Sequence, residues 1–514
     1  MSRSKRFVTG LLSSYAAIGV NILYTLASIP LALHYLDKEE FGLWALVTQL
    51  SGYLMLLEFG MGGSVARSLS DHKDHMEDGI YGSILRTGGR VFAIQGVLVA
   101  VMGLALAWFA PPLLDLPARL HQPFAILMAA QAILSGLRLS LGALGSPLWC
   151  HQRLDLSNLS SSLSLVGTFA MLWIGFHLGW HVYSLTVSFV VGTFLSLFST
   201  YFSCRWLGLY PSREHRGRYD PQLFRELFHF GGGLFMMNLG AQLASASQVI
   251  VVSRLLGMEA AATWSVATKV FSMAQQFVSR VLDSSAGGLA EMVVRQESGQ
   301  LQKRFRDLVA ISAVMAVAAS AGIALMNGAF VELWTSGKVT WAPWNNYLLA
   351  CVLFSTAVTR CHIGLVGINK QIRGMKYVYL IEGLAFVSLS VLLVPWLGLT
   401  GLLIAALACN IALTGIYGVS RSADYFGISR RDVTGWVVRP LWILLTTAGL
   451  FALTRIPVLA DSKPMFQLFA ESVIFCIVVL PALWFVGMDR RLRHEIRSLV
   501  EKALEKATAR FRST

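Results

Sequence analysis

Fourteen apolar runs of about 20 residues or more divide this sequence, and they constrain its fold more than any other feature. A helix of about 20 apolar residues is long enough to cross the hydrocarbon core of a bilayer. Only 14% of the residues are charged, well below the roughly 25% of a soluble domain. We therefore predict an all-α polytopic membrane protein of about fourteen transmembrane helices, near residues 10–35, 41–68, 85–110, 122–148, 157–178, 182–204, 228–254, 260–286, 306–333, 343–368, 377–396, 399–420, 433–454 and 465–487.

The distribution of Lys and Arg predicts the orientation of these spans, because basic residues concentrate on the cytoplasmic side of membrane proteins. With the N-terminus inside, the inner segments hold 32 of these cations and the outer segments hold six. We therefore expect a multi-pass membrane protein with both termini in the cytoplasm. The net charge of +14 comes from separate inner segments and not from one basic face, which argues against a nucleic-acid binder.

The sequence favours a transporter over an enzyme. The outer segments are short, and the largest inner segment, 205–227, is a basic connector too small for a catalytic domain. The six cysteines include no CxxC pair, and the eleven histidines show no metal-ligand spacing. We expect no catalytic residues, no metal site and no cofactor.

A shift of 220 residues aligns the second predicted span with the eighth, which indicates an internal repeat. The shift pairs Leu36 with Leu256, Glu39 with Glu259, Trp44 with Trp264, and Thr48 with Thr268. Both copies begin outside, so the halves are expected to be parallel repeats about an axis along the membrane normal. We predict an N-terminal six-helix lobe (1–204), a cytoplasmic connector (205–227), a C-terminal six-helix lobe (228–420), two extra helices (421–488) and a basic amphipathic cytoplasmic tail (489–514).

Two stretches of sequence carry a family resemblance. The first, IPLALHYLDKEEFGLWALVTQLSGYLMLLEFGMGGSVARSL, combines an acidic pair, FGLW, the step LEFG and a small-residue run ending in Arg. The second is FRELFHFGGGLF followed by VVSRLLGMEAAATWSVATKV. Both resemble the polysaccharide-transport (Wzx-like) flippases of the multidrug/oligosaccharidyl-lipid/polysaccharide exporter (MOP) superfamily. The chain departs from the family's pattern at Gln248, where Asp is frequent, and at Trp264, where Tyr is frequent.

This resemblance implies both a fold and a substrate. The fold would be MATE-like, with two six-helix bundles related by pseudo-twofold symmetry and two extra C-terminal helices. The substrate would be an undecaprenyl-diphosphate-linked oligosaccharide, moved across the inner membrane by alternating access for exopolysaccharide or O-antigen synthesis. Expected partners are the lipid bilayer, H⁺ or Na⁺ as coupling ion, and the polysaccharide polymerase and export machinery, with a monomer as the functional unit.

The helix predicted near 260–286 carries charges where a lipid-facing helix would not. At ~100° per residue, Lys269, Met273, Gln276, Arg280, Asp283 and Gly287 fall within about 40° of one line. A charge at the bilayer centre costs roughly 2.5–3.5 kcal/mol, so such a face usually lines a protein interior or a water-filled cavity. We predict that Lys269 and Arg280 bind the substrate diphosphate. Structural pairing of Arg280 with Asp283, three residues later, is the alternative. The corresponding stripe of the second span is predicted to run from Gln49 to Arg67.

Other polar residues within the spans extend the candidate site. Arg138 and Arg360 complete the predicted cationic cavity, and the acids Glu58, Asp283 and Glu382 lie at a similar depth, in the inner halves of their helices. Together these cations and acids are candidates for a gate or for binding a coupling ion, the alternative being isolated pairs that fix helix packing. Candidate contacts for sugar hydroxyls are the amides of Asn21, Gln49, Asn238, Gln242 and Gln276, although interhelical hydrogen bonds are the commoner use of such groups.

Three other functions stay open at this point. A small-molecule exporter of the multidrug (MATE) type and a peptidoglycan lipid-precursor flippase suit the same span pattern. A membrane polysaccharide polymerase or ligase is disfavoured, because it would need a sizeable outer loop. A cationic cavity favours an anionic, lipid-linked substrate over a cationic drug.

Overall fold

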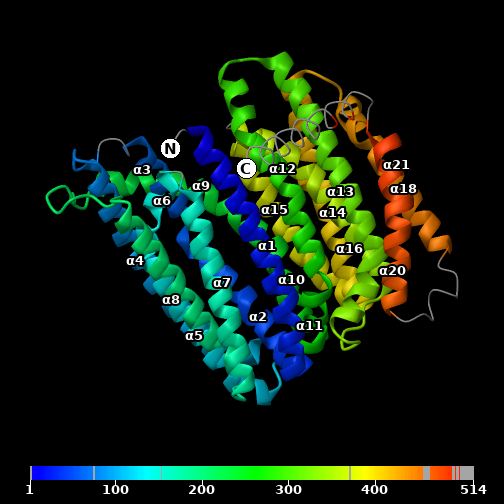
Figure 1. Cartoon of the computed structure of the whole chain (residues 1–514), viewed down its shortest axis with the longest axis horizontal. Helices are drawn as coiled ribbons and strands as arrows, with labels where there is room; N and C mark the ends of the chain where they lie inside the picture. Colours follow the sequence, from blue (N-terminus) through cyan, green and yellow to red (C-terminus); the bar gives the residue numbers. More distant parts are fainter. Residues whose placement is uncertain are drawn as a thin grey trace, which may run out of the picture. The chain divides into compact units, whose positions relative to one another are not determined.

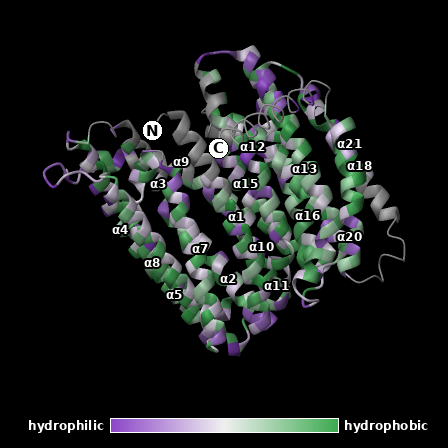
Figure 2. Cartoon of the chain, in the orientation of Figure 1, coloured by the Kyte–Doolittle hydropathy of each residue, from purple (hydrophilic) through white to green (hydrophobic). Residues whose placement is uncertain are grey.

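A computed structural model describes residues 3–72, 76–151, 153–369, 372–454, 464–488, 493 and 497. Within these ranges every regular element is a helix, and most helices are apolar along their length with hydrophilic residues gathered at their ends (Figure 2). Twelve of the described helical segments are long and apolar enough to cross a membrane. The two further predicted spans, near 260–286 and 433–454, are also helical. The all-α polytopic fold is therefore confirmed.

The first half of the chain folds into one run of helices, several of which pack in neighbouring pairs. α4 packs against α5, and α7 packs against both α8 and α1 (Figure 1). The elements are α1 (Arg3–Tyr35), α2 (Lys38–Leu54), η1 (Met55–Glu58), α3 (Met61–Asp71), α4 (Ile80–Leu113), α5 (Ala118–Ser140), η2 (Gly142–Leu144), α6 (Ser146–Cys150), α7 (Leu154–His177) and α8 (Tyr183–Trp206).

The second half follows the same order and ends with additional helices. It comprises α9 (Pro221–Ser245), α10 (Ser247–Leu256), α11 (Met258–Ala267), α12 (Lys269–Val294), α13 (Ser298–Trp334), α14 (Pro343–Ile368), α15 (Ile372–Leu397), α16 (Leu399–Cys409), the π-helix η3 (Asn410–Gly415), α17 (Ile416–Phe426), α18 (Arg430–Thr454), α20 (Pro464–Ile474), η4 (Phe475–Val479), α21 (Leu480–Ala482) and η5 (Leu483–Gly487). The basic tail predicted at 489–514 lies outside the described residues, apart from 493 and 497.

The helix bounds repeat at an interval of 220 residues. α2 begins at Lys38 and α11 begins at Met258, 220 residues later. At the far end of each half, α8 ends at Trp206 and α17 ends at Phe426, again 220 residues apart. The interval found from one pair of spans therefore recurs at the start of the second span and at the end of the sixth span of each half.

The span predicted at 41–68 is not one continuous helix. α2 ends at Leu54, a short 3₁₀ turn follows, and α3 begins only at Met61. Between them Phe59 and Gly60 have φ angles of 50° and 69°, a conformation that a right-handed helix cannot contain. The predicted stripe from Gln49 to Arg67 assumed an unbroken helix and is wrong, because the turn redirects every residue after Leu54.

Packing divides the chain into two compact units. Unit 1 contains Met1–Val266 and Tyr379–Trp396, and unit 2 contains Ala267–Val378 and Leu397–Thr514. In unit 2, buried residues of α12, α13, α14 and α18 share one apolar core, which includes Val278, Val317, Ala357 and Ile443. These units are defined by packing and not by the repeat, so the lobe boundaries at 204 and 228 stay a prediction.

Candidate substrate-binding site

The charged stripe lies on α12, which is unbroken from Lys269 to Val294. One face of the helix is apolar, with Val278 and Leu282 buried in the cores that also contain residues of α13 and α14. The predicted polar face carries Gln276, Arg280 and Asp283, whose side chains are all exposed. α12 is therefore an amphipathic helix whose charged face is left uncovered.

The start of α12 is fixed by amide side chains from neighbouring helices. α11 ends at Ala267, and the carbonyl of that residue accepts a hydrogen bond from Asn327 Nδ2 on α13 at 3.2 Å. Asn327 Nδ2 also donates to Asn346 Oδ1 on α14 at 2.8 Å, and Trp341 Nε1 donates to the same oxygen at 2.9 Å. This anchoring places the half-buried Lys269 at the first position of α12.

Asp283 pairs with Arg360 of α14 and not with Arg280. Arg360 Nη2 lies 2.9 Å from Asp283 Oδ1, and the two side chains are 50% and 39% exposed. A pair this accessible contributes no more than about 1 kcal/mol to stability. In the described part of the chain Arg280 has no ion-pair partner, so the alternative of local pairing with Asp283 is not the arrangement found. The charged face of α12 and the adjacent Arg360 of α14 together hold three cations and one acid: Lys269, Arg280, Arg360 and Asp283.

The other charged candidates lie on different helices and are not joined to one another by the described contacts. Arg138 is exposed in the last turn of α5. Glu58 Oε1 accepts a hydrogen bond from the Gly62 backbone N–H at 2.9 Å, across the turn that interrupts span two. Glu382 is buried in α15, next to Gly383, which packs directly against α9. Of the predicted gate residues, the described contacts join Asp283 and Arg360; a gating or ion-coupling role stays a prediction.

Among the amide candidates, Gln242 lies at a contact between α9 and α2. Its backbone carbonyl accepts a hydrogen bond from Tyr53 of α2 at 3.3 Å, and its side-chain oxygen accepts one from Ser245 at 3.3 Å. The Tyr53 hydroxyl also hydrogen-bonds Ser247, so α2 is tied to the α9–α10 junction. The other amides differ in accessibility: Asn21 and Gln49 are partly buried, and Asn238 and Gln276 are exposed.

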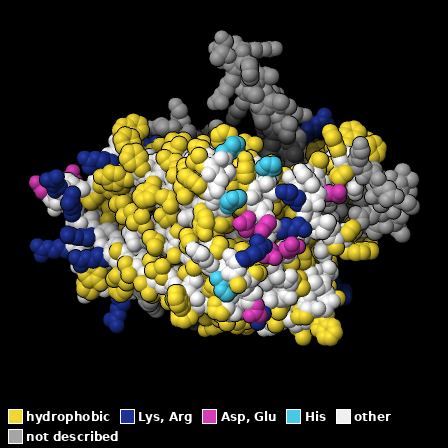
Figure 3. Space-filling model, turned by 90° about the horizontal axis from the view of Figure 1, so that it is seen from below, with side chains coloured by type: hydrophobic (Ala, Val, Ile, Leu, Met, Phe, Trp, Pro, Cys, Tyr) yellow, Lys and Arg dark blue, Asp and Glu magenta, His cyan; other side chains and the backbone are white. Residues whose placement is uncertain are grey.

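The structure contains a group of ion pairs that was not predicted from the sequence. These pairs lie at one end of unit 1, the end predicted to face the outside of the membrane. Arg119 bridges two acids, with Nη1 at 2.9 Å from Asp37 Oδ2 and Nη2 at 2.6 Å from Glu39 Oε2. Lys38 Nζ lies 3.8 Å from Glu259 Oε2, and Arg254 contacts Asp115. We call these seven residues the outer ion-pair cluster; Figure 3 shows acidic and basic side chains gathered together on the face seen from below.

The start of α2, which carries three residues of the outer ion-pair cluster, is also stabilised by hydrogen bonds between side chains and the backbone. Asp37 and Glu40 form a capping box at the start of α2, because Asp37 Oδ1 accepts from the Glu40 N–H at 2.7 Å and Glu40 Oε2 accepts from the Asp37 N–H at 3.0 Å. Burial alone would raise the pKa of Asp37, but these N–H donors and the Arg119 guanidinium outweigh it and hold the pKa below its usual value. Asp37 therefore stays ionised and keeps the outer ion-pair cluster together.

One buried acid inside a predicted span had also not been expected. Glu471 on α20 is only 2% exposed, and its Oε1 accepts a hydrogen bond from Gln467 Nε2 at 3.0 Å. The signal was present in the sequence, since Glu471 is the one acid in the apolar run 465–487. Glu471 lies only seven residues into the predicted span, and the apolar pattern does not show whether such a residue is buried or lies at the exposed end of the helix.

Comparison with known protein families identifies the chain. A family described as "Polysaccharide biosynthesis protein" matches residues 8–285, which is more than half of the sequence. The chain belongs to this family. A comparison with curated proteins gives no match.

The fold of this polysaccharide biosynthesis protein is shared with transporters of the MOP superfamily. An inward-facing multidrug resistance MATE transporter superposes with a TM-score of 0.64 at 12% identity, covering 79% of this chain and 96% of its own. The lipid II flippase MurJ, in an inward closed conformation, gives a TM-score of 0.64 at 13% identity and covers 91% of this chain and 97% of its own. A MOP transporter from Pyrococcus furiosus gives 0.60 at 13% identity, covering 82% and 96%. The expected MATE-like fold is confirmed.

Proposed function

We propose that this protein is a flippase that carries an undecaprenyl-diphosphate-linked oligosaccharide across the bacterial inner membrane by alternating access, for exopolysaccharide or O-antigen synthesis. The family supports a role in polysaccharide synthesis, and the fold supports transport. The single observation that carries the substrate assignment is the uncovered cationic face of α12. A diphosphate is the part of such a substrate that a cationic face would bind.

Two positions on α12 suit a diphosphate. Arg280 is exposed and can pair two oxygens at once, and Lys269 supplies a compact charge nearer the end predicted to lie outside. Eleven residues separate them, which is about 16 Å along a helix, or roughly half of the ~30 Å hydrocarbon core. We infer that the diphosphate first meets Arg280 and the Arg360–Asp283 pair and then Lys269 as the protein changes its open side.

A peptidoglycan lipid-precursor flippase is the second candidate. The supporting observation is the match to the lipid II flippase, which covers 91% of this chain, more than the MATE and P. furiosus structures do. Both substrates present a diphosphate on a polyprenyl tail, so α12 suits either of them. A MATE-type exporter of cationic drugs is less well supported, because three cations and one acid on and beside α12 would repel a cation.

Deletion of the gene tests the proposal, with the accumulating lipid-linked intermediate identified by mass spectrometry. We expect an undecaprenyl-diphosphate oligosaccharide to accumulate in the inner leaflet and surface polysaccharide to be lost. Accumulation of the peptidoglycan precursor instead would assign the second candidate.

Complementation of the deletion then tests the role of α12. Wild-type protein and Lys303→Ala, which changes an exposed lysine of α13, should restore export. Lys269→Ala should leave the intermediate accumulated, although the protein is present in the membrane. Normal export by Lys269→Ala would refute the binding role.

A further inference from the structure

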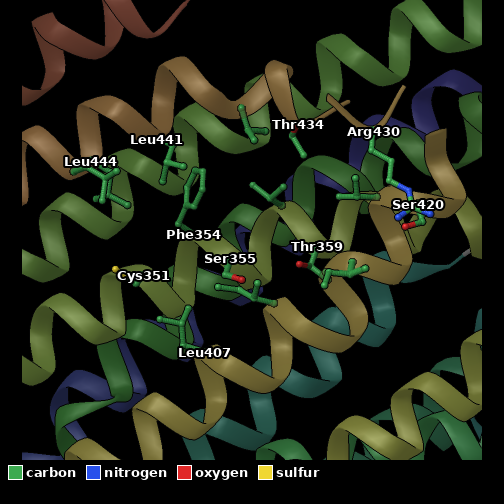
Figure 4. Close-up of a pocket in the computed structure, with 17 residues that line it drawn as sticks. Cys351, Phe354, Ser355, Thr359, Leu407, Ser420, Arg430, Thr434, Leu441 and Leu444 are labelled. Carbon is green, nitrogen blue, oxygen red and sulfur yellow. The ribbon is translucent and has the colours of Figure 1, made fainter. Parts of the chain in front are cut away.

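A groove of about 630 Å³ runs through unit 2 between α14, the continuous α16–η3–α17 helix and α18 (Figure 4). Its wall is largely apolar, and the residues that form most of it are Phe354, Val358, Leu407, Ile411, Leu441 and Leu444. In a membrane protein an apolar groove of this size is filled by hydrocarbon and not by water, because water gains no hydrogen bonds there.

Two hydroxyls of the wall, those of Ser355 and Thr359, are bonded to Asn410, which lies outside the lining. Ser355 Oγ donates to Asn410 Oδ1 at 2.6 Å, and Asn410 Nδ2 donates to Thr414 Oγ1 at 3.1 Å. Asn410 begins the π-helical turn η3, where the wider winding ends at Gly415, a residue of the lining without a side chain. The turn therefore shapes one wall of the groove and engages the hydroxyls of Ser355 and Thr359.

One end of the groove is cationic. Arg430, the first residue of α18, lies beside Ser420 at one end, whereas Cys351 and Leu444 lie toward the other (Figure 4). Arg430 is exposed and has no ion-pair partner in the described part of the chain. Asp432, the nearest acid in sequence, accepts a hydrogen bond from Ser429 Oγ at 2.7 Å within the helix cap. The distribution of Lys and Arg places this end of α18 on the cytoplasmic side.

We propose that this groove binds an anionic phospholipid of the inner leaflet, with its phosphate on Arg430 and one acyl chain along α14 and α18. From Arg430 to Leu445 the lining follows α18 for about 22 Å, enough for a chain that crosses the ~15 Å hydrocarbon half of a bilayer. The volume falls within the roughly 300–1,000 Å³ of sites that enclose one small ligand. A polyprenyl chain is several times longer and does not fit.

Because the groove lies beside α18, a lipid bound in it would affect how α18 packs on its neighbours. α18 packs against α13 and α17, and the groove lies on the side where α18 faces α14. An acyl chain in the groove would complete the packing of α18 on the repeat-derived helices of unit 2. The site is independent of the transported substrate, because none of its lining residues belongs to α12.

Photo-crosslinking in nanodiscs tests this site with the full-length protein. The probe is phosphatidylglycerol with a diazirine on one acyl chain, compared with phosphatidylcholine carrying the same chain. We expect phosphatidylglycerol to label peptides of α14 and α18, and unlabelled phosphatidylglycerol to compete for the site. Arg430→Gln should weaken labelling about tenfold, a change of about 1.4 kcal/mol. Arg431→Gln, the matched control at an adjacent exposed arginine outside the lining, should label as the wild type does.

A second variant tests the groove itself without changing charge. Val358→Trp should fill the space beside Phe354 and abolish labelling of α14, with helicity and gel filtration unchanged. Equal labelling by the phosphatidylcholine probe, equal effects of the two arginine variants, or displacement of the probe by polyprenyl phosphate would each overturn the proposal. If Val358→Trp does not fold, the comparison of Arg430→Gln with Arg431→Gln still decides it.

Discussion

Gly42→Ala is expected to loosen the end of unit 1 that holds the outer ion-pair cluster. Gly42 lies in the buried face of α2, where a Cβ atom would overlap the backbone carbonyl of Met258 at the start of α11. A backbone carbonyl cannot rotate away as a flexible side chain can. The methyl group must therefore displace α2 from α11, two helices that begin 220 residues apart in the repeat.

The size of the effect follows from two opposing contributions. Overpacking of a close contact costs about 1–3 kcal/mol. Alanine in place of glycine within a helix recovers about 0.5–1 kcal/mol. Because the obstructing atom is a backbone carbonyl, the upper part of the overpacking range applies, about 2–3 kcal/mol. A net loss of about 1–2 kcal/mol then remains, which corresponds to a 5- to 30-fold shift away from the packed arrangement.

Hydrogen exchange measured by mass spectrometry is the assay, on peptides from the starts of α2 and α11. Exchange there should accelerate by this 5- to 30-fold factor, because local opening sets the rate. Gly19→Ala is the matched control, since no atom lies within 4 Å of the position its Cβ would take; it should leave these peptides unchanged. Equal exchange in the two variants would refute the reasoning.

Three further predictions concern individual contacts. Asp283→Arg combined with Arg360→Asp should recover the transport that either single change reduces, measured as restored surface polysaccharide; failure of the double variant would show that the pairing of the two charges is not what transport requires. Because the folded pKa of Asp37 is lowered, its stabilising contribution is present above the ordinary value of about 3.9 and is lost as the pH falls through the lowered value. The destabilisation of Arg119→Ala relative to wild type, measured by denaturation, should therefore vanish in acid, and persistence there would contradict the pairing. Tyr53→Phe should lower the free energy of unfolding by about 0.5–1.5 kcal/mol, and no change would show that its two hydrogen bonds contribute nothing.

The sequence predicts most of the fold because the two signals it depends on are long. Apolar runs of about 20 residues remain recognisable despite local irregularities, and the 220-residue shift that aligns the second span with the eighth indicates the repeat. The structure reproduces that interval in the starts of α2 and α11 and in the ends of α8 and α17.

The break in span two could not be read from the same signals. Residues 55–63 are mostly apolar or glycine, so hydropathy treats them as helix. The left-handed conformation of Phe59 depends on local contacts, among them the hydrogen bond from Gly62 to Glu58, that composition does not show. Glycine at position 60 permits such a turn, but glycine is equally compatible with a helix bend or a close helix contact and does not by itself predict the break.

The sequence predicts which residues share the charged face of α12, but it does not predict which of them form ion pairs. Helical spacing identifies the face shared by Lys269, Arg280 and Asp283, because it needs only one unbroken helix. The partner of Asp283 is 77 residues away on α14, and a single sequence contains no information on that contact. The outer ion-pair cluster is similar: Glu39 and Glu259 stand out in the repeat, whereas Arg119 reaches Glu39 from the start of α5.

Translocation in proteoliposomes tests the central claim most directly. Purified protein is reconstituted with a fluorescent undecaprenyl-diphosphate oligosaccharide, and transfer between leaflets is followed by quenching from outside. We predict transfer by the wild type and by Lys303→Ala, and its loss in Lys269→Ala and Arg280→Gln. Absence of transfer by the wild type, in vesicles where the same protein exports a cationic dye, would contradict the account.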